Sequence, residues 1–208
     1  MNNFKKVGIG DSSMQLIVRK EYLNELIELY GTPDIKVITG IRRSGKSVLL
    51  QEFVSYLQSL EEPINIVMIN LQELEFDHLL EYHALHKYIL DQYREGMANV
   101  LLIDEVQLCL QFELAINSIY TKGIYDIYIT GSNAYFMSSD IATLLTGRYV
   151  EIQMLPLSFA EFYFSKYEEQ QYSLIPAYEA YLRESSFPYT QQLGGEDFDI
   201  QEYLRGLF

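Results

Sequence analysis

A short glycine-containing segment constrains this chain more than any other feature. It matches in full the pattern G-x-x-x-x-G-K-[ST] and is Gly40-Ile41-Arg42-Arg43-Ser44-Gly45-Lys46-Ser47. An apolar β-branched run at residues 35–39 precedes it, and residues 47–60 have the apolar spacing of a helix. The glycines let successive N–H groups point inward at the start of that helix, which creates a concave anion site. The segment therefore predicts a loop that binds phosphate groups.

Individual side chains of this loop have predicted roles. Lys46 would reach the β- and γ-phosphate oxygens of ATP, and the Ser47 hydroxyl would ligate Mg²⁺. Arg42 and Arg43 either touch phosphate oxygens or a neighbouring subunit, or they are solvated side chains of an exposed loop. The residues expected to bind the nucleotide are Gly40, Arg42, Arg43, Ser44, Gly45, Lys46, Ser47 and Val48.

The rest of the chain alternates apolar runs with helical patterns. Strands are predicted at residues 35–39, 64–69, 100–103, 127–130 and 149–154, and helices at 47–60, 78–94, 111–121 and around 136–146. This alternation predicts an α/β fold, in which helices cover both faces of a parallel sheet. We expect a nucleotide-binding core with its lead-in at residues 1–155 and a helical, aromatic and acidic segment at residues 156–208.

Two further groups of polar residues follow predicted strands. Asp104 and Glu105 end the apolar run at 100–103, where Asp104 would hold Mg²⁺ and Glu105 would act as a general base on the attacking water. Acids are also common where a strand simply ends. Ser132 or Asn133, with Thr130 behind them, would sense the γ-phosphate, although Gly-Ser-Asn is also ordinary turn chemistry.

Composition narrows the class of partner. The net charge is −14, but residues 1–50 hold 8 basic and 5 acidic side chains, whereas residues 51–208 hold 7 and 24. A surface with so few cations releases few counterions from a phosphate backbone, so we do not expect this domain to bind nucleic acid. Cys109 is the one cysteine, and no apolar run is long enough to span a membrane, which predicts a cytoplasmic protein. Cys109 is expected in the core.

Three histidines, His78, His83 and His86, lie close together in the sequence. The last two have the i, i+3 spacing that can ligate zinc on a helix. Neither a cysteine nor a second short acid accompanies them, so a helix face is the better interpretation.

Taken together, the motifs resemble AAA-type ATPases of the additional-strand P-loop class. More narrowly, the chain resembles the bacterial and archaeal family that joins an N-terminal ATPase domain to a C-terminal domain of unknown function. Five segments carry the resemblance, namely residues 40–47, 102–107, 130–133, 144–148 and 155–162. The resemblance implies a three-layer fold with sheet order 5-1-4-3-2. It also implies a Walker A role for residues 40–47, a Walker B role for Asp104 and Glu105, and a sensor role for Ser132 or Asn133.

The same resemblance extends to more peripheral features. Arg148 would face a phosphate in its own chain or a neighbour's site in a homo-oligomer, unless it pairs with an acid such as Glu151. Residues 17–19 and Tyr22 stand where the family contacts adenine. The sequence stops in what looks like a helix without a cap, so we expect a C-terminal domain that is missing here.

Three functions compete at this point. The first is Mg²⁺-dependent ATP hydrolysis coupled to a conformational change of a C-terminal domain or an oligomer partner. The second is a nucleotide-gated interaction switch with negligible turnover. The third is a small-molecule kinase, which is disfavoured because only Arg183 and Arg205 lie beyond residue 148 to form an arginine-rich lid.

Overall fold

The computed structural model describes residues 17, 19–132, 145, 147–167, 173–184 and 187–188. The chain divides into two compact units. The sheet unit comprises Lys20–Gly40 and Lys46–Met154, and the helical unit comprises Met1–Arg19, Ile41–Gly45 and Leu155–Phe208. The expected division into one domain at residues 1–155 and another at residues 156–208 stays a prediction.

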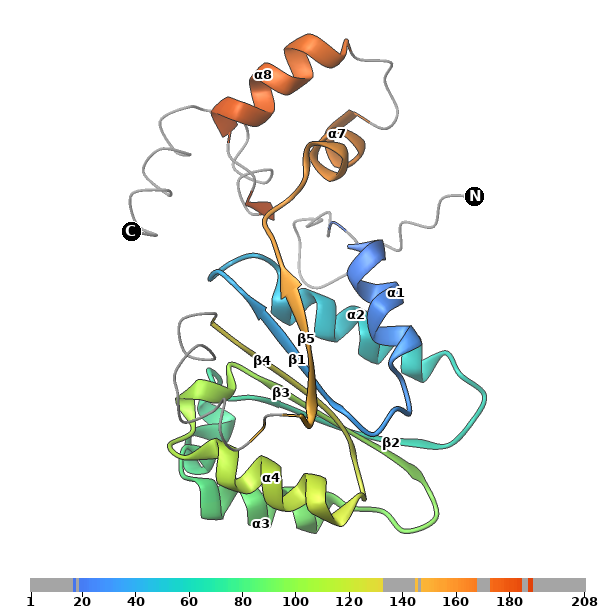
Figure 1. The fold of residues 1–208 in the computed structure, drawn as a ribbon, viewed down its shortest axis with the longest axis vertical. Coiled ribbons are helices and arrows are strands. Elements are labelled where there is room, and N and C mark those ends of the chain that lie inside the picture. The colour runs from blue at the N-terminus through green and yellow to red at the C-terminus, as the bar shows by residue number, and fades with distance from the viewer. Residues whose placement is uncertain are drawn as a thin grey trace. The chain divides into compact units, whose positions relative to one another are not determined.

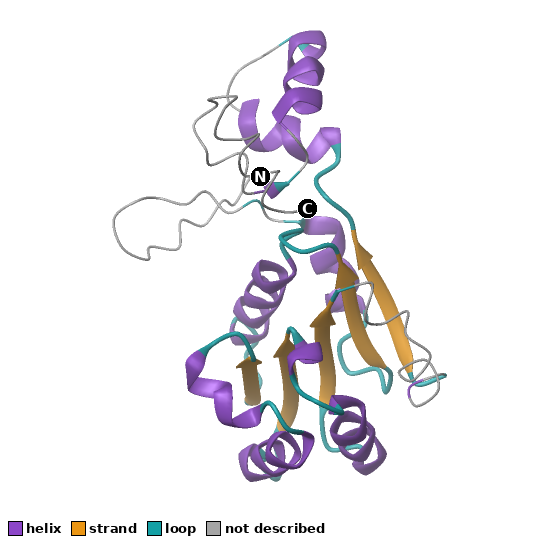
Figure 2. Cartoon of the chain, turned by 90° about the vertical axis from the view of Figure 1, so that its left-hand side faces the viewer, coloured by secondary structure: helices purple, strands orange, loops and turns teal. Residues whose placement is uncertain are grey.

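The sheet unit is built on five parallel strands (Figures 1 and 2). They are β1 (Ile35–Gly40), β2 (Ile64–Asn70), β3 (Ala98–Asp104), β4 (Asp126–Gly131) and β5 (Tyr149–Met154). Their order is β2-β3-β4-β1-β5, which is the predicted 5-1-4-3-2 read from the other edge. The prediction of an α/β P-loop NTPase fold with a five-stranded parallel sheet is therefore confirmed.

Helices cover both faces of this sheet (Figure 1). One face packs against α1 (Lys20–Glu28) and α2 (Lys46–Gln58), and the other packs against α3 (Tyr82–Gln92) and α4 (Phe112–Lys122). Strand β3 shows why its sequence is apolar throughout. Val100 and Leu102 belong to the core under α1 and α2, whereas Leu101 and Ile103 belong to the core under α3 and α4. Alternate side chains of β3 point to opposite faces of the sheet, and helices cover both faces, so these four side chains are buried in an apolar core.

The helix predictions need two corrections, since one helix begins later than expected and another was not expected. The helix expected from residue 78 begins only at Tyr82, because the Glu81 carboxylate accepts hydrogen bonds from the backbone N–H groups of His83 and Ala84 and caps α3. The preceding residues form a short 3-10 helix, η1 (Leu74–Leu79). Helix α1 was not predicted at all. The helix expected around 136–146 falls, apart from residue 145, outside the described residues.

The helical unit contains α7 (Phe159–Tyr167) and α8 (Leu174–Glu184), in the segment for which helices are predicted. Within that unit, the Tyr181 hydroxyl of α8 donates to the Leu157 carbonyl 2.9 Å away. Aromatic rings join the two helices, since Phe159 lies edge-on to Tyr178 and to Tyr181. The aromatic residues of this segment therefore pack against one another.

A buried ion pair lies at the amino ends of β1 and β4. The Lys36 ammonium is fully buried and contacts the Asp126 carboxylate at 2.5 Å and the Thr32 carbonyl at 2.7 Å. Asp126 also accepts from the backbone N–H of Gly31 and from the Tyr128 hydroxyl. This pair is structural, because it lies at the edge of the sheet opposite to the loop of residues 40–47.

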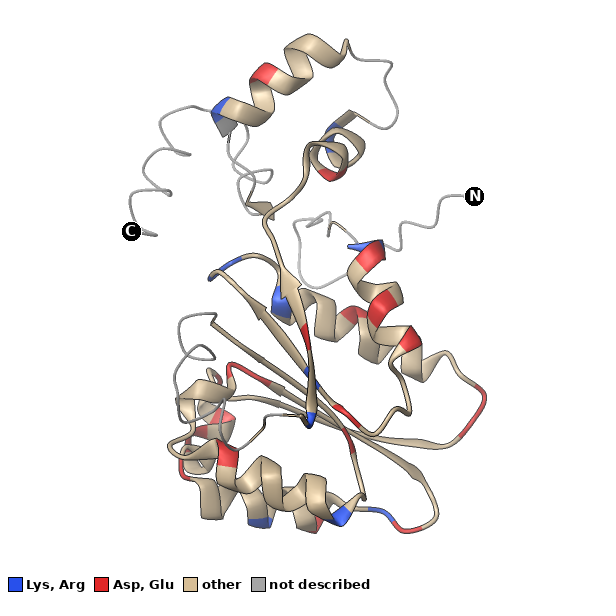
Figure 3. Ribbon diagram, viewed as in Figure 1, with Lys and Arg blue, Asp and Glu red and all other residues tan. Residues whose placement is uncertain are grey.

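Acidic side chains also occur outside residues 51–208, where the sequence has its acidic excess. Helix α1 bears Glu21, Glu25 and Glu28 (red in Figure 3). Whether this unit avoids nucleic acid stays a prediction. No helix in the described part of the chain is long and apolar enough to cross a membrane.

Candidate active site

The phosphate loop joins the carboxyl end of β1 to the amino end of α2. Two of its residues have left-handed backbone angles, Arg43 with φ 67° and Gly45 with φ 103°. The Ser44 N–H donates to the Ile41 carbonyl at 3.2 Å, which closes the turn. Ser44 is buried, whereas Arg42 and Arg43 are exposed. The backbone therefore turns within the loop, and both arginines are exposed.

Lys46 is the first residue of α2 and is 4% exposed. Its ammonium donates to the Gly40 carbonyl at 3.1 Å, across the base of the loop. Burial lowers the pKa of Lys46, and the negative charges of Glu105 and Asp104 oppose that shift. The two acids predicted for the metal and the general base therefore lie within electrostatic reach of the loop lysine. Ser47 and Val48 follow in the first turn of α2 and are partly exposed.

Asp104 ends β3 and is 1% exposed. The Thr130 hydroxyl donates to Asp104 Oδ1 at 2.5 Å and accepts from the Glu105 N–H at 2.9 Å. Thr130 is fully buried in β4, the strand between β3 and β1. A single hydroxyl thus orients the aspartate and fixes the start of the turn that carries the glutamate. From the sequence, Thr130 is only the third candidate for the γ-phosphate sensor, after Ser132 and Asn133.

Glu105 occupies a left-handed backbone conformation, with φ 54° and ψ 49°, just before the 3-10 helix η2 (Val106–Leu108). Such angles are uncommon for residues other than glycine and cluster at functional sites. The Gln107 side-chain amide donates to Glu105 Oε2, while Gln107 Oε1 is buried without a hydrogen-bond partner. The turn therefore holds the Glu105 carboxylate through Gln107 and exposes it only in part.

The sensor candidates follow β4. Ser132 comes directly after Gly131, is partly exposed, and lies at the same edge of the sheet as the ends of β1 and β3. Asn133 lies outside the described residues. The choice between the two stays a prediction.

Arg148 is not part of this cluster. It precedes β5, and its carbonyl accepts from the Ile35 N–H at the amino end of β1. Since β1 and β5 pair in parallel from Ile35 to Gly40, Arg148 lies roughly 20 Å from the carboxyl end of β1, at about 3.3 Å per residue. Its guanidinium contacts Asn117 and lies 5.8 Å from the Tyr120 ring, both on α4. This position does not support contact with a phosphate on its own chain.

The expected alternative partner of Arg148 is occupied elsewhere. Glu151 accepts a hydrogen bond from the Thr39 hydroxyl at 2.7 Å. The structure therefore pairs Arg148 with Asn117 and Glu151 with Thr39 rather than with each other.

The weaker candidates behave as structural residues. His86 Nε2 lies 3.0 Å from the Ser118 hydroxyl, and burial lowers its pKa. Among the residues that the structure describes, no group of three or more metal-ligating side chains is found. Cys109 is fully buried, and burial raises its pKa to about 12, as expected for a core residue.

Arg19 has partners that the sequence did not indicate. Contact of residues 17–19 with adenine, which the family resemblance implies, stays a prediction. The Arg19 guanidinium is 4% exposed and engaged by the Glu161 carboxylate and by main-chain carbonyls of the helical unit. Its partner is 142 residues away in the sequence. No local pattern could have pointed to this pair.

Comparison with known proteins identifies the family of this domain. Residues 32–163 match a family model that describes an AAA domain. This chain belongs to the AAA domain family. The matched range contains the phosphate loop, Asp104, Glu105, Thr130 and Arg148. Membership supports nucleotide binding by an ATPase-type domain.

Relatives and solved structures extend the comparison. An uncharacterized protein of Haemophilus influenzae is 38% identical over 181 residues, 85% of this chain and 45% of that protein. An uncharacterized protein of Methanocaldococcus jannaschii is 29% identical over 209 residues, 94% of this chain and 46% of that protein. The chain thus spans less than half the length of these two relatives. The Aeropyrum pernix ORC1 protein in complex with DNA has TM-score 0.51 and 12% identity, over 71% of this chain and 47% of that one. The last likeness shows the fold alone.

Proposed function

We propose that this chain binds ATP together with Mg²⁺ and hydrolyses it to ADP and phosphate. The observation that carries the proposal is the buried Lys46, which lies at the base of the phosphate loop and within the field of Asp104 and Glu105. A buried ammonium beside two carboxylates and a curled backbone suits a triphosphate with a divalent cation. Membership of the AAA domain family supports the same substrate.

The residues present fit Mg²⁺ bound together with a nucleotide. Mg²⁺ prefers oxygen ligands, keeps several waters and is commonly held by one or two protein groups plus substrate phosphates. Ser47 offers a hydroxyl, and the Asp104 carboxylate is oriented by Thr130. When bound, the cation neutralises charge on the β- and γ-phosphate oxygens.

The chain's own groups account for the remaining chemistry. Backbone N–H groups of residues 41–47 and the Lys46 ammonium hold the phosphates. Glu105 accepts a proton from a water molecule, whose oxygen attacks the γ-phosphorus while the bond to the β–γ bridging oxygen breaks. Ser132 or Asn133 senses the γ-phosphate. Arg42 and Arg43 add positive charge at the entrance of the loop.

The length of the relatives supports a proposal about the partners of this domain. The relatives are more than twice as long as the matched segment, so a second domain is the natural recipient of the conformational change. Arg148 lies at the sheet edge opposite to its own loop, which suits an arginine finger that acts on a neighbouring copy in a homo-oligomer. A reducing cytoplasmic location suits a chain whose one cysteine is buried.

A second candidate function is a nucleotide-gated switch with negligible turnover. The contact between Gln107 and Glu105 favours it, because a carboxylate engaged by an amide is a weaker acceptor for a water proton. Phosphate release far below the roughly 1 s⁻¹ of ordinary enzymes, together with nucleotide-dependent oligomer size, would identify the switch.

Isothermal calorimetry tests nucleotide binding. We expect the wild type to bind ATP in the presence of Mg²⁺ and Lys46→Ala to give no binding heat. Lys87→Ala is the matched control, because Lys87 is an exposed lysine paired with Asp91 on α3. Equal heats for the wild type and Lys46→Ala would refute the site.

Phosphate release tests hydrolysis. Glu105→Gln should bind ATP with the wild-type affinity and lose phosphate release by at least about a hundredfold, the lower range for a general base. Unchanged turnover in this variant would remove Glu105 from the mechanism while leaving nucleotide binding intact.

A further inference from the structure

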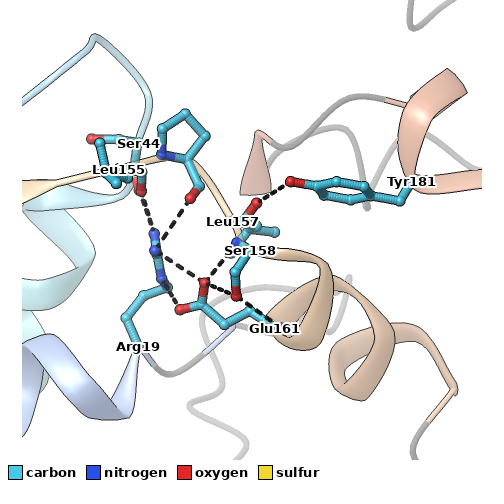
Figure 4. A network of polar contacts seen from close by, with 8 residues as sticks. Arg19, Ser44, Leu155, Leu157, Ser158, Glu161 and Tyr181 are labelled. Carbon is cyan, nitrogen blue, oxygen red and sulfur yellow. Dashed lines mark hydrogen bonds and ion pairs between the residues drawn. The ribbon is translucent and has the colours of Figure 1, made fainter. Parts of the chain in front are cut away.

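A polar network around the buried Arg19 joins three segments of the helical unit that are distant in the sequence (Figure 4). The Arg19 guanidinium contacts the Glu161 carboxylate twice, with Nε 2.5 Å from Oε1 and Nη2 3.2 Å from Oε2. It also donates to the main-chain carbonyls of Ser44 at 3.3 Å, Leu155 at 3.0 Å and Pro156 at 3.5 Å. One side chain thus connects the phosphate loop, the segment after β5 and helix α7.

The contact with Ser44 bears directly on the loop. The peptide bond between Ser44 and Gly45 is trans, so its C=O and N–H groups point in opposite directions. When Arg19 holds the Ser44 carbonyl, the Gly45 N–H is directed away from Arg19. Gly45 has φ 103°, so this peptide unit would otherwise have several accessible orientations. Arg19 therefore selects one orientation of a peptide N–H within the phosphate-binding pattern.

The contact with Glu161 bears on the start of α7. Glu161 Oε2 accepts from the Ser158 N–H and the Ser158 hydroxyl, each at 2.8 Å, and the Glu161 N–H donates to the Ser158 hydroxyl at 3.3 Å. This is the S-x-x-E capping box, which satisfies the first amides of a helix. The carboxylate that caps α7 is thus the one that neutralises Arg19.

Resting on the proposed function, we propose that Arg19 is a positioning residue that couples nucleotide binding at the phosphate loop to the first turn of α7. Its charge is neutralised by Glu161, so it acts through orientation rather than by attracting phosphate. The planar fork reaches five acceptor oxygens at once, which a lysine ammonium with three donors cannot do.

Coupling of this kind is reciprocal. A nucleotide that requires the observed orientation of the Ser44–Gly45 peptide stabilises the Arg19 network, and with it the capped end of α7. Equally, weakening the cap lowers nucleotide affinity, although residue 158 lies outside the phosphate loop. If the ion pair were purely structural, breaking it would lower stability with or without nucleotide, and α7 would not respond to nucleotide in the wild type.

Hydrogen exchange with mass spectrometry on the full chain, with and without ADP and Mg²⁺, tests the coupling. In the wild type we expect nucleotide to slow exchange of the amides of residues 159–167. In Arg19→Lys and Glu161→Gln, nucleotide should bind about tenfold more weakly, a loss of about 1.4 kcal/mol, and α7 should no longer respond. Ser158→Ala removes the cap of α7 at an exposed residue and should weaken nucleotide binding severalfold. This variant keeps the coupling testable if Arg19→Lys or Glu161→Gln fails to fold.

Lys36→Met is the matched control, because it breaks the buried Lys36–Asp126 pair of the sheet unit. It should lower the melting temperature and leave both the affinity and the protection of α7 at wild-type values. If the wild type binds nucleotide but α7 exchange is unchanged, or if Arg19→Lys and Ser158→Ala bind as tightly as the wild type, the coupling is refuted and the proposed function stands. Absence of nucleotide binding in the wild type would refute both.

Discussion

The Thr130 hydroxyl connects the carboxyl ends of β3 and β4, and its removal has a predictable cost in stability. Thr130 is fully buried, donates to Asp104 Oδ1 and accepts from the Glu105 N–H. Thr130→Val keeps the shape and β-branching of the side chain but removes both hydrogen bonds. The Asp104 oxygen and the Glu105 amide lose their partner in a dry environment.

The magnitude follows from these two contacts. A hydrogen bond to a charged group contributes about 1.5–3 kcal/mol to stability and a neutral one about 0.5–1.5 kcal/mol. The extra methyl group of valine recovers roughly 0.8 kcal/mol of transfer free energy. We therefore expect Thr130→Val to lower the free energy of unfolding by about 2–3 kcal/mol. Thr130→Ser keeps the hydroxyl and loses one buried methyl, which costs about 1 kcal/mol.

Urea unfolding followed by far-UV circular dichroism measures both variants. With a slope of about 2–3 kcal/mol per molar urea, Thr130→Val should shift the midpoint down by about 1 M and Thr130→Ser by less than half of that. The valine variant should also weaken Mg²⁺-dependent ATP binding, because Asp104 loses the group that orients it. A serine variant less stable than the valine variant would refute the reasoning, since packing and not hydrogen bonding would then dominate.

Three further predictions concern neighbouring groups. Burial lowers the pKa of Lys46 in the folded chain below its value in the unfolded chain. Between these two pKa values the unfolded state binds more protons, so the free energy of unfolding rises with pH. Calorimetry without nucleotide at neutral pH should therefore show a higher melting temperature for Lys46→Met than for the wild type, and a lower one would contradict the direction of the shift. Gln107→Ala frees the Glu105 carboxylate and should raise phosphate release severalfold, the equivalent of about 1 kcal/mol; a fall would show that Gln107 aids the reaction. Cys109, whose pKa burial raises to about 12, should react with a thiol reagent at pH 8 only after urea unfolds the chain, and rapid reaction of the folded protein would show that the thiol is accessible.

Local patterns were sufficient for the strands and for the nucleotide loop. The short apolar run at residues 100–103 predicts a strand covered on both faces, because it has no polar position that could face water. The loop of residues 40–47 carries its own glycines, lysine and serine in fixed spacing. Helix α1 was missed although Tyr22, Leu23, Leu26 and Ile27 have the apolar spacing of a helix and lie in the core that α1 shares with α2.

The contacts that complete the site depended on chain segments meeting across the fold. Thr130 meets Asp104 because β4 pairs with β3, and Arg148 is carried to the far edge because β5 pairs with β1 in parallel register. Arg19 meets Glu161 across 142 residues. Residue type and spacing encode what one segment does by itself. The order and register of the strands decide which side chains become partners. Burial then makes these partners necessary, because a buried charged or polar group is stable only where a partner from elsewhere in the chain reaches it.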